Sequence, residues 1–156
     1  MEELDLYGTI DACVCCLDSV NYVTRPKALL RAFQRVHLFL MPGGLFLFDV
    51  NTPEKLESLD GGMFIDETDD TYCVWRADYA RRSRICTYGF DLFFREESGL
   101  WRREEEVHQE RAYAPEELTE LLRTAGFTHI RQYGDRKLRP PKPGEGRIFF
   151  AARKEL

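Results

Sequence analysis

The stretch Ile10-Asp11-Ala12-Cys13-Val14-Cys15-Cys16-Leu17-Asp18-Ser19-Val20-Asn21-Tyr22 decides the fold. Its centre is apolar and its polar side chains lie toward the two ends, which predicts a strand buried on both faces. Strands of this kind belong to parallel sheets that helices cover on both sides. Because a domain rarely opens with its central strand, we expect the chain to begin in the middle of a fold.

The next segments repeat an α/β alternation. Thr24 can cap a helix whose first turn tolerates Pro26, and apolar residues then recur at helical spacing as far as Leu40. The helix is expected to stop at residues 41–44, where the sequence is Met-Pro-Gly-Gly, and a second buried strand follows over residues 45–50. The order strand, helix, strand predicts a right-handed parallel crossover.

The middle of the chain has a different period. Three antiparallel strands are predicted over residues 72–79, 85–95 and 100–113, because apolar residues alternate there. The second of these strands carries an aromatic row on one face, which we expect to pack against the main sheet or a partner, with a substrate pocket as the alternative. The acidic residues 66–70 are predicted to form an exposed loop.

The last part closes the sheet. Pro115 suits the first turn of a helix that Gly126 ends, and two strands are predicted over residues 128–133 and 147–153. The chain is therefore expected to have three parts: residues 1–62 and 114–156 in the core, and residues 63–113 as an antiparallel β insertion.

Composition narrows the function. The 156 residues are 44% hydrophobic and carry a net charge of −5, which is typical of a folded domain and argues against a broad nucleic-acid-binding surface. No segment approaches the ~20 apolar residues of a membrane span, so no membrane partner is expected and a cytoplasmic location is the default. The five cysteines show no metal-ligand spacing, although Cys73 and Cys86 could face each other across a hairpin. No metal site is predicted.

Several motifs occur in an order that belongs to a known family. They are CCLDSVNY (15–22), LMPGG (40–44), FLFDVNTPEKL (46–56), EEVHQERAY (105–113) and AGF (125–127). Together they resemble the second half of a class I S-adenosylmethionine-dependent methyltransferase, of the small bacterial type with a β insertion after the fifth strand. The resemblance implies an α/β fold: a partial Rossmann-like sheet of strands four to seven, in the order four, five, seven, six with the last strand antiparallel.

The same resemblance shows what this sequence lacks. Enzymes of the family hold S-adenosylmethionine through a glycine-rich turn after their first strand, and no such turn occurs here. The chain is therefore expected to be a truncated, C-terminal portion that is inactive by itself. The alternative is a noncatalytic remnant or partner subunit that binds another protein.

Candidate site residues follow from the resemblance. Leu17, Asp18, Ser19 and Asn21 would border the methionine end of S-adenosylmethionine in the complete enzyme, and Asn51 and Thr52 would border an unknown methyl acceptor. The alternative is that Asp18 and Ser19 cap a turn and that Asn51 forms an Asx turn before Pro53.

The third insertion strand supplies a candidate base. Strand alternation places His108 on one side with Glu104, Glu106 and Glu110, so it could act as a catalytic base or be an exposed histidine on a charged strand. Arg111 and Tyr113 are predicted either to bind an acidic substrate or to hold the insertion against the sheet.

An assembly is also expected. If the strand around residues 12–17 is an edge, it has unpaired backbone groups and no charge that deters pairing. We therefore expect a homodimer or larger homo-oligomer, or a complementing N-terminal half that covers this edge.

Overall fold

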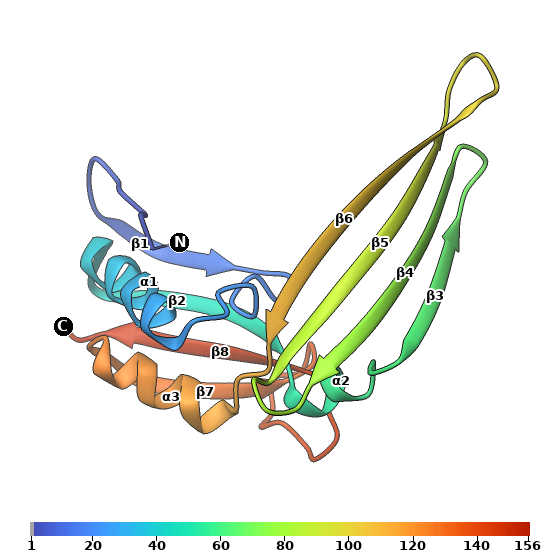
Figure 1. Ribbon diagram of the computed structural model, residues 1–156. Helices are drawn as coiled ribbons and strands as arrows, with labels where there is room; N and C mark the ends of the chain where they lie inside the picture. The colour runs from blue at the N-terminus through green and yellow to red at the C-terminus, as the bar shows by residue number, and fades with distance from the viewer. Residues whose placement is uncertain (1) are drawn as a thin grey trace.

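The computed structural model describes residues 2–156, which form two four-stranded sheets (Figure 1). The first sheet has the order β1-β2-β8-β7. In it, β1 (Ile10–Cys15) and β2 (Leu40–Asn51) are parallel and are joined by α1 (Pro26–Phe39). The other two strands are β7 (Phe127–Gly134) and β8 (Arg147–Lys154), preceded by α3 (Pro115–Thr124). Because β8 is antiparallel to both neighbours, the expected order and direction are confirmed.

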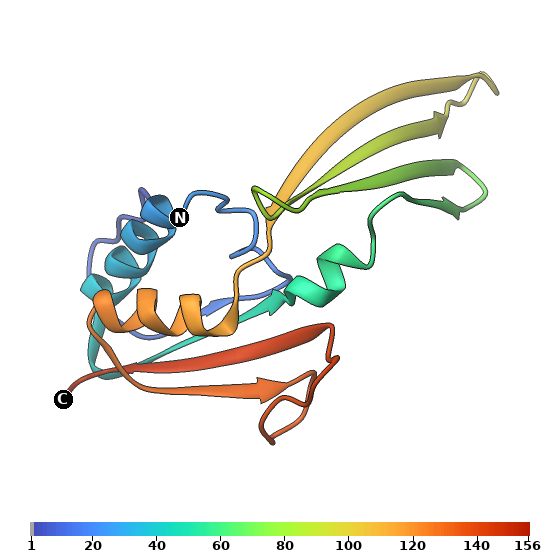
Figure 2. The same ribbon diagram turned by 60° about the horizontal axis from the view of Figure 1, so that its bottom comes forward.

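The second sheet is an antiparallel meander that arches away from the first (Figures 1 and 2). Its strands are β3 (Gly62–Glu67), β4 (Thr71–Ala80), β5 (Ile85–Arg95) and β6 (Trp101–Arg111), and the short α2 (Pro53–Glu57) connects it to β2. The predicted loop at residues 66–70 is wrong in part, because Asp66 and Glu67 belong to β3. An edge strand with exposed charges has too little apolar alternation to be seen in the sequence.

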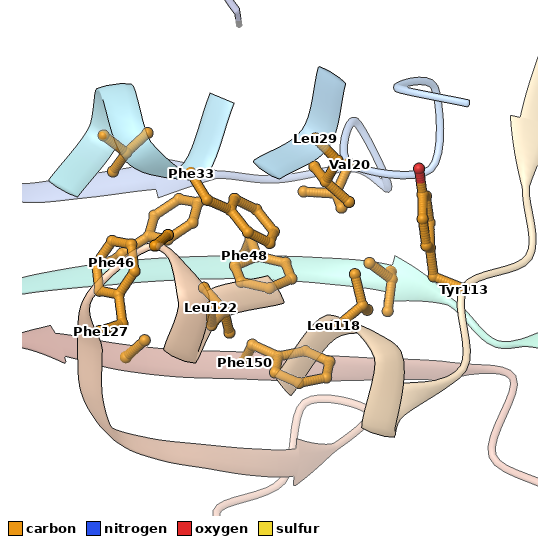
Figure 3. Packing of buried hydrophobic residues seen from close by; sticks show 14 of the residues in the cluster. Val20, Leu29, Phe33, Phe46, Phe48, Tyr113, Leu118, Leu122, Phe127 and Phe150 are labelled. Atoms are coloured by element: carbon orange, nitrogen blue, oxygen red, sulfur yellow. The ribbon is translucent and has the colours of Figure 1, made fainter. Parts of the chain in front are cut away.

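The main core lies between the first sheet and the two longer helices (Figure 3). Phe46 and Phe48 of β2 lie under Phe33 of α1, with ring centroids 5.7 and 5.5 Å from it. Phe150 of β8 stacks on Phe48 at 4.9 Å. Leu118 and Leu122, both fully buried, pack α3 on the same layer (Figure 3). The apolar stripes of both helices therefore face one side of the sheet, as their periodicity predicts.

The prediction that β1 is buried on both faces is wrong. Cys13 and Cys15 pack on the core, but Val14 points to the other face and is 61% exposed. Figure 2 shows both longer helices on one side of the first sheet and neither on the other. An apolar run indicates that a face needs cover, but it does not say whether the cover comes from these 156 residues.

Two smaller predictions also differ from the structure. Arg25, not Thr24, is the N-cap of α1, and it makes no side-chain capping bond. Residues 41–44 belong to β2 instead of forming only a turn. The register of β2 opposite β1 shifts between Ile10 and Ala12. A Cβ on Gly44 would lie 2.8 Å from the Met41 carbonyl oxygen and 3.1 Å from that of Asp11, so this irregular pairing favours glycine.

Cysteine pairing and membrane spans can be judged directly. Cys73 lies opposite Leu92 and Cys86 opposite Tyr79, so the two do not face each other, and the five cysteines, all within residues 2–156, form no disulfide. Among the helices of residues 2–156, none is long and apolar enough to cross a bilayer.

Candidate functional site

Polar side chains gather where β1 and β2 end, at a rim that also receives the end of β6. Just after β1, Leu17 and Asp18 have left-handed φ angles of 58° and 49°, and the Ser19 hydroxyl donates to the Cys16 carbonyl at 2.7 Å. Two consecutive non-glycine residues in this conformation are strained, and such strain is common at binding sites. The turn leaves the Leu17 side chain exposed at the rim.

A charged cluster lies beneath this turn. Arg147, the first residue of β8, donates to Asp18 at 2.7 Å and also to Asp49, whose side chain is 3% exposed. The Asp18 backbone N–H donates to the Asp49 carboxylate at 3.1 Å. Burial disfavours the charged guanidinium, but the hydrogen bonds and charges of both carboxylates outweigh it and raise the pKa of Arg147. The cluster therefore fixes the turn to the ends of β2 and β8.

Asn21 joins the core to the insertion. Its side chain is fully buried, and its Nδ2 donates to the carbonyl oxygens of Asn51 at 3.1 Å and Arg111 at 3.0 Å. Its Oδ1 accepts from the Asn51 N–H at 3.0 Å. One amide thus connects the ends of β2 and β6, and the predicted contact of Asn21 with a cofactor remains a prediction.

Glu110 is a buried acid at the same junction. It is 3% exposed and accepts a hydrogen bond from Asn51 Nδ2 at 3.0 Å, while Asn51 Oδ1 accepts from Arg147 at 3.3 Å. Burial raises the pKa of Glu110 to about 7; the Asn51 hydrogen bond lowers it, and the nearby charge of Asp18 raises it. Burial also raises the pKa of Tyr88, with the charge of Glu110 as a further cause. This carboxyl can therefore hold or release a proton near neutral pH.

His108 lies on the same face of β6 as Glu110, two residues farther from the end of the strand that meets the core. Its Nε2 lies 3.0 Å from Glu106 Oε2, and its ring makes edge contacts with Tyr22 and Phe90 at 5.8 and 5.2 Å. The carboxylate and the aromatic rings hold the imidazole beside the loop that follows β1. The prediction that it serves as a base remains a prediction.

The other predicted substrate residues make structural contacts. The Thr52 hydroxyl donates to the Glu145 carbonyl at 3.0 Å and caps α2. Arg111 donates to Glu117 at 3.3 Å, and the buried Tyr113 donates its hydroxyl proton to the Val23 carbonyl. These contacts join the end of β6 to α3 and to the loop before α1, and the roles expected for Arg111 and Tyr113 remain predictions.

Two open hollows flank this junction. One, of about 340 Å³, lies at the rim and includes Leu17, Asp49 and Arg147 in its lining. The other, of about 670 Å³, lies beside Tyr22 and His108. Asn51 and Glu110 are buried and hydrogen-bonded to each other at the junction between the residues that line these two hollows. The sequence alone did not assign roles to Asp49, Arg147, Tyr88 or Glu110, although a charge within the apolar strand at Asp49 is a signal that could have been used.

Comparison with known proteins relates this chain to proteins named as methyltransferases. No protein-family model matches the chain. A Bacillus subtilis (strain 168) protein named "Putative methyltransferase YqeM" is 30% identical over 148 residues, which are 94% of this chain and 60% of that protein. The chain thus spans less than two thirds of the length of this relative.

Solved structures agree on the fold. An S-adenosylmethionine-dependent methyltransferase from Clostridium acetobutylicum ATCC 824 superposes with a TM-score of 0.89 at 24% identity, over 99% of this chain and 62% of that one. The amino pentose methyltransferase CalS10 from Micromonospora echinaspora, with S-adenosylmethionine bound, gives a TM-score of 0.70 at 19% identity, over 98% of this chain and 62% of that one.

The sheet and its insertion define a Rossmann-like α/β fold. The chain has the fold of the class I S-adenosylmethionine-dependent methyltransferases and is a sequence relative of proteins named as methyltransferases. The resemblance found in the sequence is confirmed.

Proposed function

We propose that this chain forms the rim and the acceptor side of an S-adenosylmethionine-dependent methyltransferase. The observation that carries the proposal is the polar junction at the carboxyl ends of β1 and β2, where Asp18, Asp49 and Arg147 meet the buried end of the insertion. Ligands of open α/β sheets bind at such strand ends. The methyltransferase relatives and the shared fold support the assignment.

The donor set suits the methionine end of S-adenosylmethionine. Carboxylates and a guanidinium at one rim are complementary to an ammonium and a carboxylate group, and the exposed Leu17 offers an apolar contact beside them. When bound, S-adenosylmethionine supplies an activated methyl group on a positively charged sulfur. We propose that Leu17, Asp18 and Ser19 border this end, with Asn21 fixing the loop from below.

The hollow beside His108 is proposed to receive the acceptor. Methyl transfer is a direct displacement, so most of the catalysis comes from alignment, and a base is needed only for a protonated acceptor. His108 would take that proton. Asn51 and Thr52, held by Glu110 and Glu145, would shape the wall between the two groups, and Arg111 and Tyr113 would keep the insertion in place.

S-adenosylmethionine is expected to bind this chain alone with a dissociation constant weaker than micromolar, because the sequence has no glycine-rich turn. Titration calorimetry measures it, first on the chain alone and then with the part of the Bacillus relative that the chain does not match. We propose that this part acts as a complementing N-terminal half. A micromolar constant for the chain alone would show that the cofactor site is misplaced.

The same mixture tests the acceptor side. With an acceptor found by screening, His108→Ala should lower kcat/KM by about a hundredfold if the histidine takes the acceptor proton. Glu105→Ala, on the opposite face of β6 and outside the lining of this hollow, is the matched control and should have little effect. Equal kcat/KM for the two variants would remove His108 from the proposed mechanism, and binding without turnover would favour a noncatalytic partner subunit.

Self-association through the β1 edge is the proposed assembly. The strand pairs only with β2 in the sheet of residues 2–156, and its outward Val14 is exposed. Val14→Lys should reduce a dimer to a monomer in light scattering, because charged edges resist strand pairing. Asp11→Lys, on the same strand, tests whether any added charge has this effect. A monomeric parent chain at high micromolar concentration would contradict the proposal.

A further inference from the structure

Three carboxyl groups and one guanidinium meet between the rim and the insertion. Asp18 and Asp49 both accept hydrogen bonds from Arg147, and Glu110, which is 3% exposed, lies beside Asp18. Within residues 2–156, Arg147 is the one cation that forms an ion pair with any of the three acids. Three negative charges against one positive charge are unfavourable where water is excluded. One of the three carboxyls is therefore expected to keep a proton at neutral pH.

Glu110 is the carboxyl placed to keep that proton. Its Oε2 accepts from a neutral amide, Asn51 Nδ2, at 3.0 Å, and Arg147 donates to the Oδ1 of the same Asn51 at 3.3 Å. Four titratable groups face Glu110 from the neighbouring segments: Asp18 and Tyr22 after β1, and Cys86 and Tyr88 on β5. None of the four is a cation, and both Asp18 and Tyr88 form side-chain hydrogen bonds with Glu110. Burial and the charge of Asp18 both raise the pKa of Glu110.

The proton decides how Glu110 acts on the turn after β1. A protonated carboxyl donates a hydrogen bond to the Asp18 carboxylate, whereas an ionised carboxyl repels it. Asp18 has a left-handed φ of 49°, and its carbonyl oxygen accepts from the Asn21 N–H at 2.8 Å. The Asn21 carbonyl oxygen accepts from the Arg111 N–H, also at 2.8 Å. A force on Asp18 therefore acts on the backbone that joins the turn to β6.

We propose that Glu110 is a positioning residue that acts through Asp18: its proton clamps the turn of residues 17–21 to the end of β6, and loss of the proton loosens that turn. Leu17 lines the rim hollow, whereas Tyr22 and His108 line the other one. One proton thus governs how the two hollows are held relative to each other. The use of this proton in methyl transfer rests on the proposed function, but the link between the proton and the turn does not, and it is tested without a ligand.

A carboxyl titration tests the link between the two acids. Carbon-13 NMR follows the side-chain carboxyl of Glu110, whose signal is identified by its loss in Glu110→Gln. Asp18→Asn should lower the pH midpoint of Glu110 by at least about one unit, because it removes the adjacent negative charge. Asp135→Asn is the matched control: Asp135 lines the rim hollow but pairs with Arg136, so the midpoint should not move. Equal midpoints in the two variants would overturn the proposal.

Hydrogen exchange tests the loosening of the turn. With the intrinsic effect of pH removed, protection of the Asn21 and Arg111 amides should fall at least about tenfold between pH ~6 and pH ~8.5 in the parent chain. Glu110→Gln stays neutral, so these amides should show no such fall in that variant. The Thr68 amide, which donates to the Thr71 carbonyl at 2.8 Å between β3 and β4, is the internal control and should not change. Protection at Asn21 that does not depend on pH, or an equal fall at Thr68, would contradict the proposal.

Discussion

Arg147→Met is expected to lower the free energy of unfolding by about 3–5 kcal/mol, because it leaves the nearly inaccessible Asp49 carboxylate without its cation. The change also removes the bond to Asp18, so the strained turn at Leu17 loses its anchor. Urea unfolding followed by circular dichroism measures the loss. Arg131→Met, exposed on the neighbouring strand, is the control and should cost less than ~0.5 kcal/mol.

A second variant separates the unpaired charge from lost packing. Adding Asp49→Asn to Arg147→Met should restore at least about half of the lost stability, because the buried negative charge disappears with its partner. If the single change cost under ~1 kcal/mol, or if the second change gave no recovery, the charged cluster would not hold the rim together.

Glu110 makes stability depend on pH in the direction opposite to most carboxylates. Its folded pKa of about 7 lies above the ordinary value of 4.5, so the folded state binds the proton more tightly than the unfolded state. The contribution of the protonated acid is complete below pH ~4.5, falls as pH rises through ~7, and is absent above it. The loss amounts to at most about 3 kcal/mol.

Glu110→Gln imitates the protonated acid at every pH and should abolish this loss. At pH 8 the variant should therefore be more stable than the parent chain by about 1–3 kcal/mol, and at pH 4.5 the two should be nearly equal. Urea midpoints across this range provide the measurement. Glu104→Gln, more exposed on the same strand face and paired with Arg102, should leave the profile unchanged. If the stability of the parent chain rose steadily from pH 5 to 8, and the stability of Glu110→Gln followed the same profile, Glu110 would ionise without cost to the fold.

The sequence predicts best where the deciding signals are local. Pro115 at the first turn and Gly126 after the last locate α3, and the periodicity of residues 26–39 locates α1. The sheet order followed from the family resemblance. Which residues pack over a strand is not a local property, so nothing in the run around Val14 indicates what covers that side chain. The strand β3 was missed because its charged residues hide the alternation of its apolar ones.

The candidate site was predictable only in part. Asn21 follows β1 and Asn51 ends the adjacent parallel strand β2, so their proximity could be expected. Their partners could not: Arg111 is 90 residues from Asn21, and Arg147 is 129 residues from Asp18. Strand alternation placed Glu110 on the correct face with His108, but only the three-dimensional structure shows that Glu110 is buried and His108 half-exposed.

The insertion has the geometry of a lever arm. Near its base Leu56 packs on Ala77, Cys86 and Ala112, and Asn21 joins β6 to β2. An eleven-residue strand such as β5 reaches about 35 Å from that base. A rotation of ~10° at the fulcrum therefore sweeps the tip through ~6 Å while residues beside Asn21 barely move. Such a rotation would leave the residues near His108 almost in place and would displace the outer hairpins farthest.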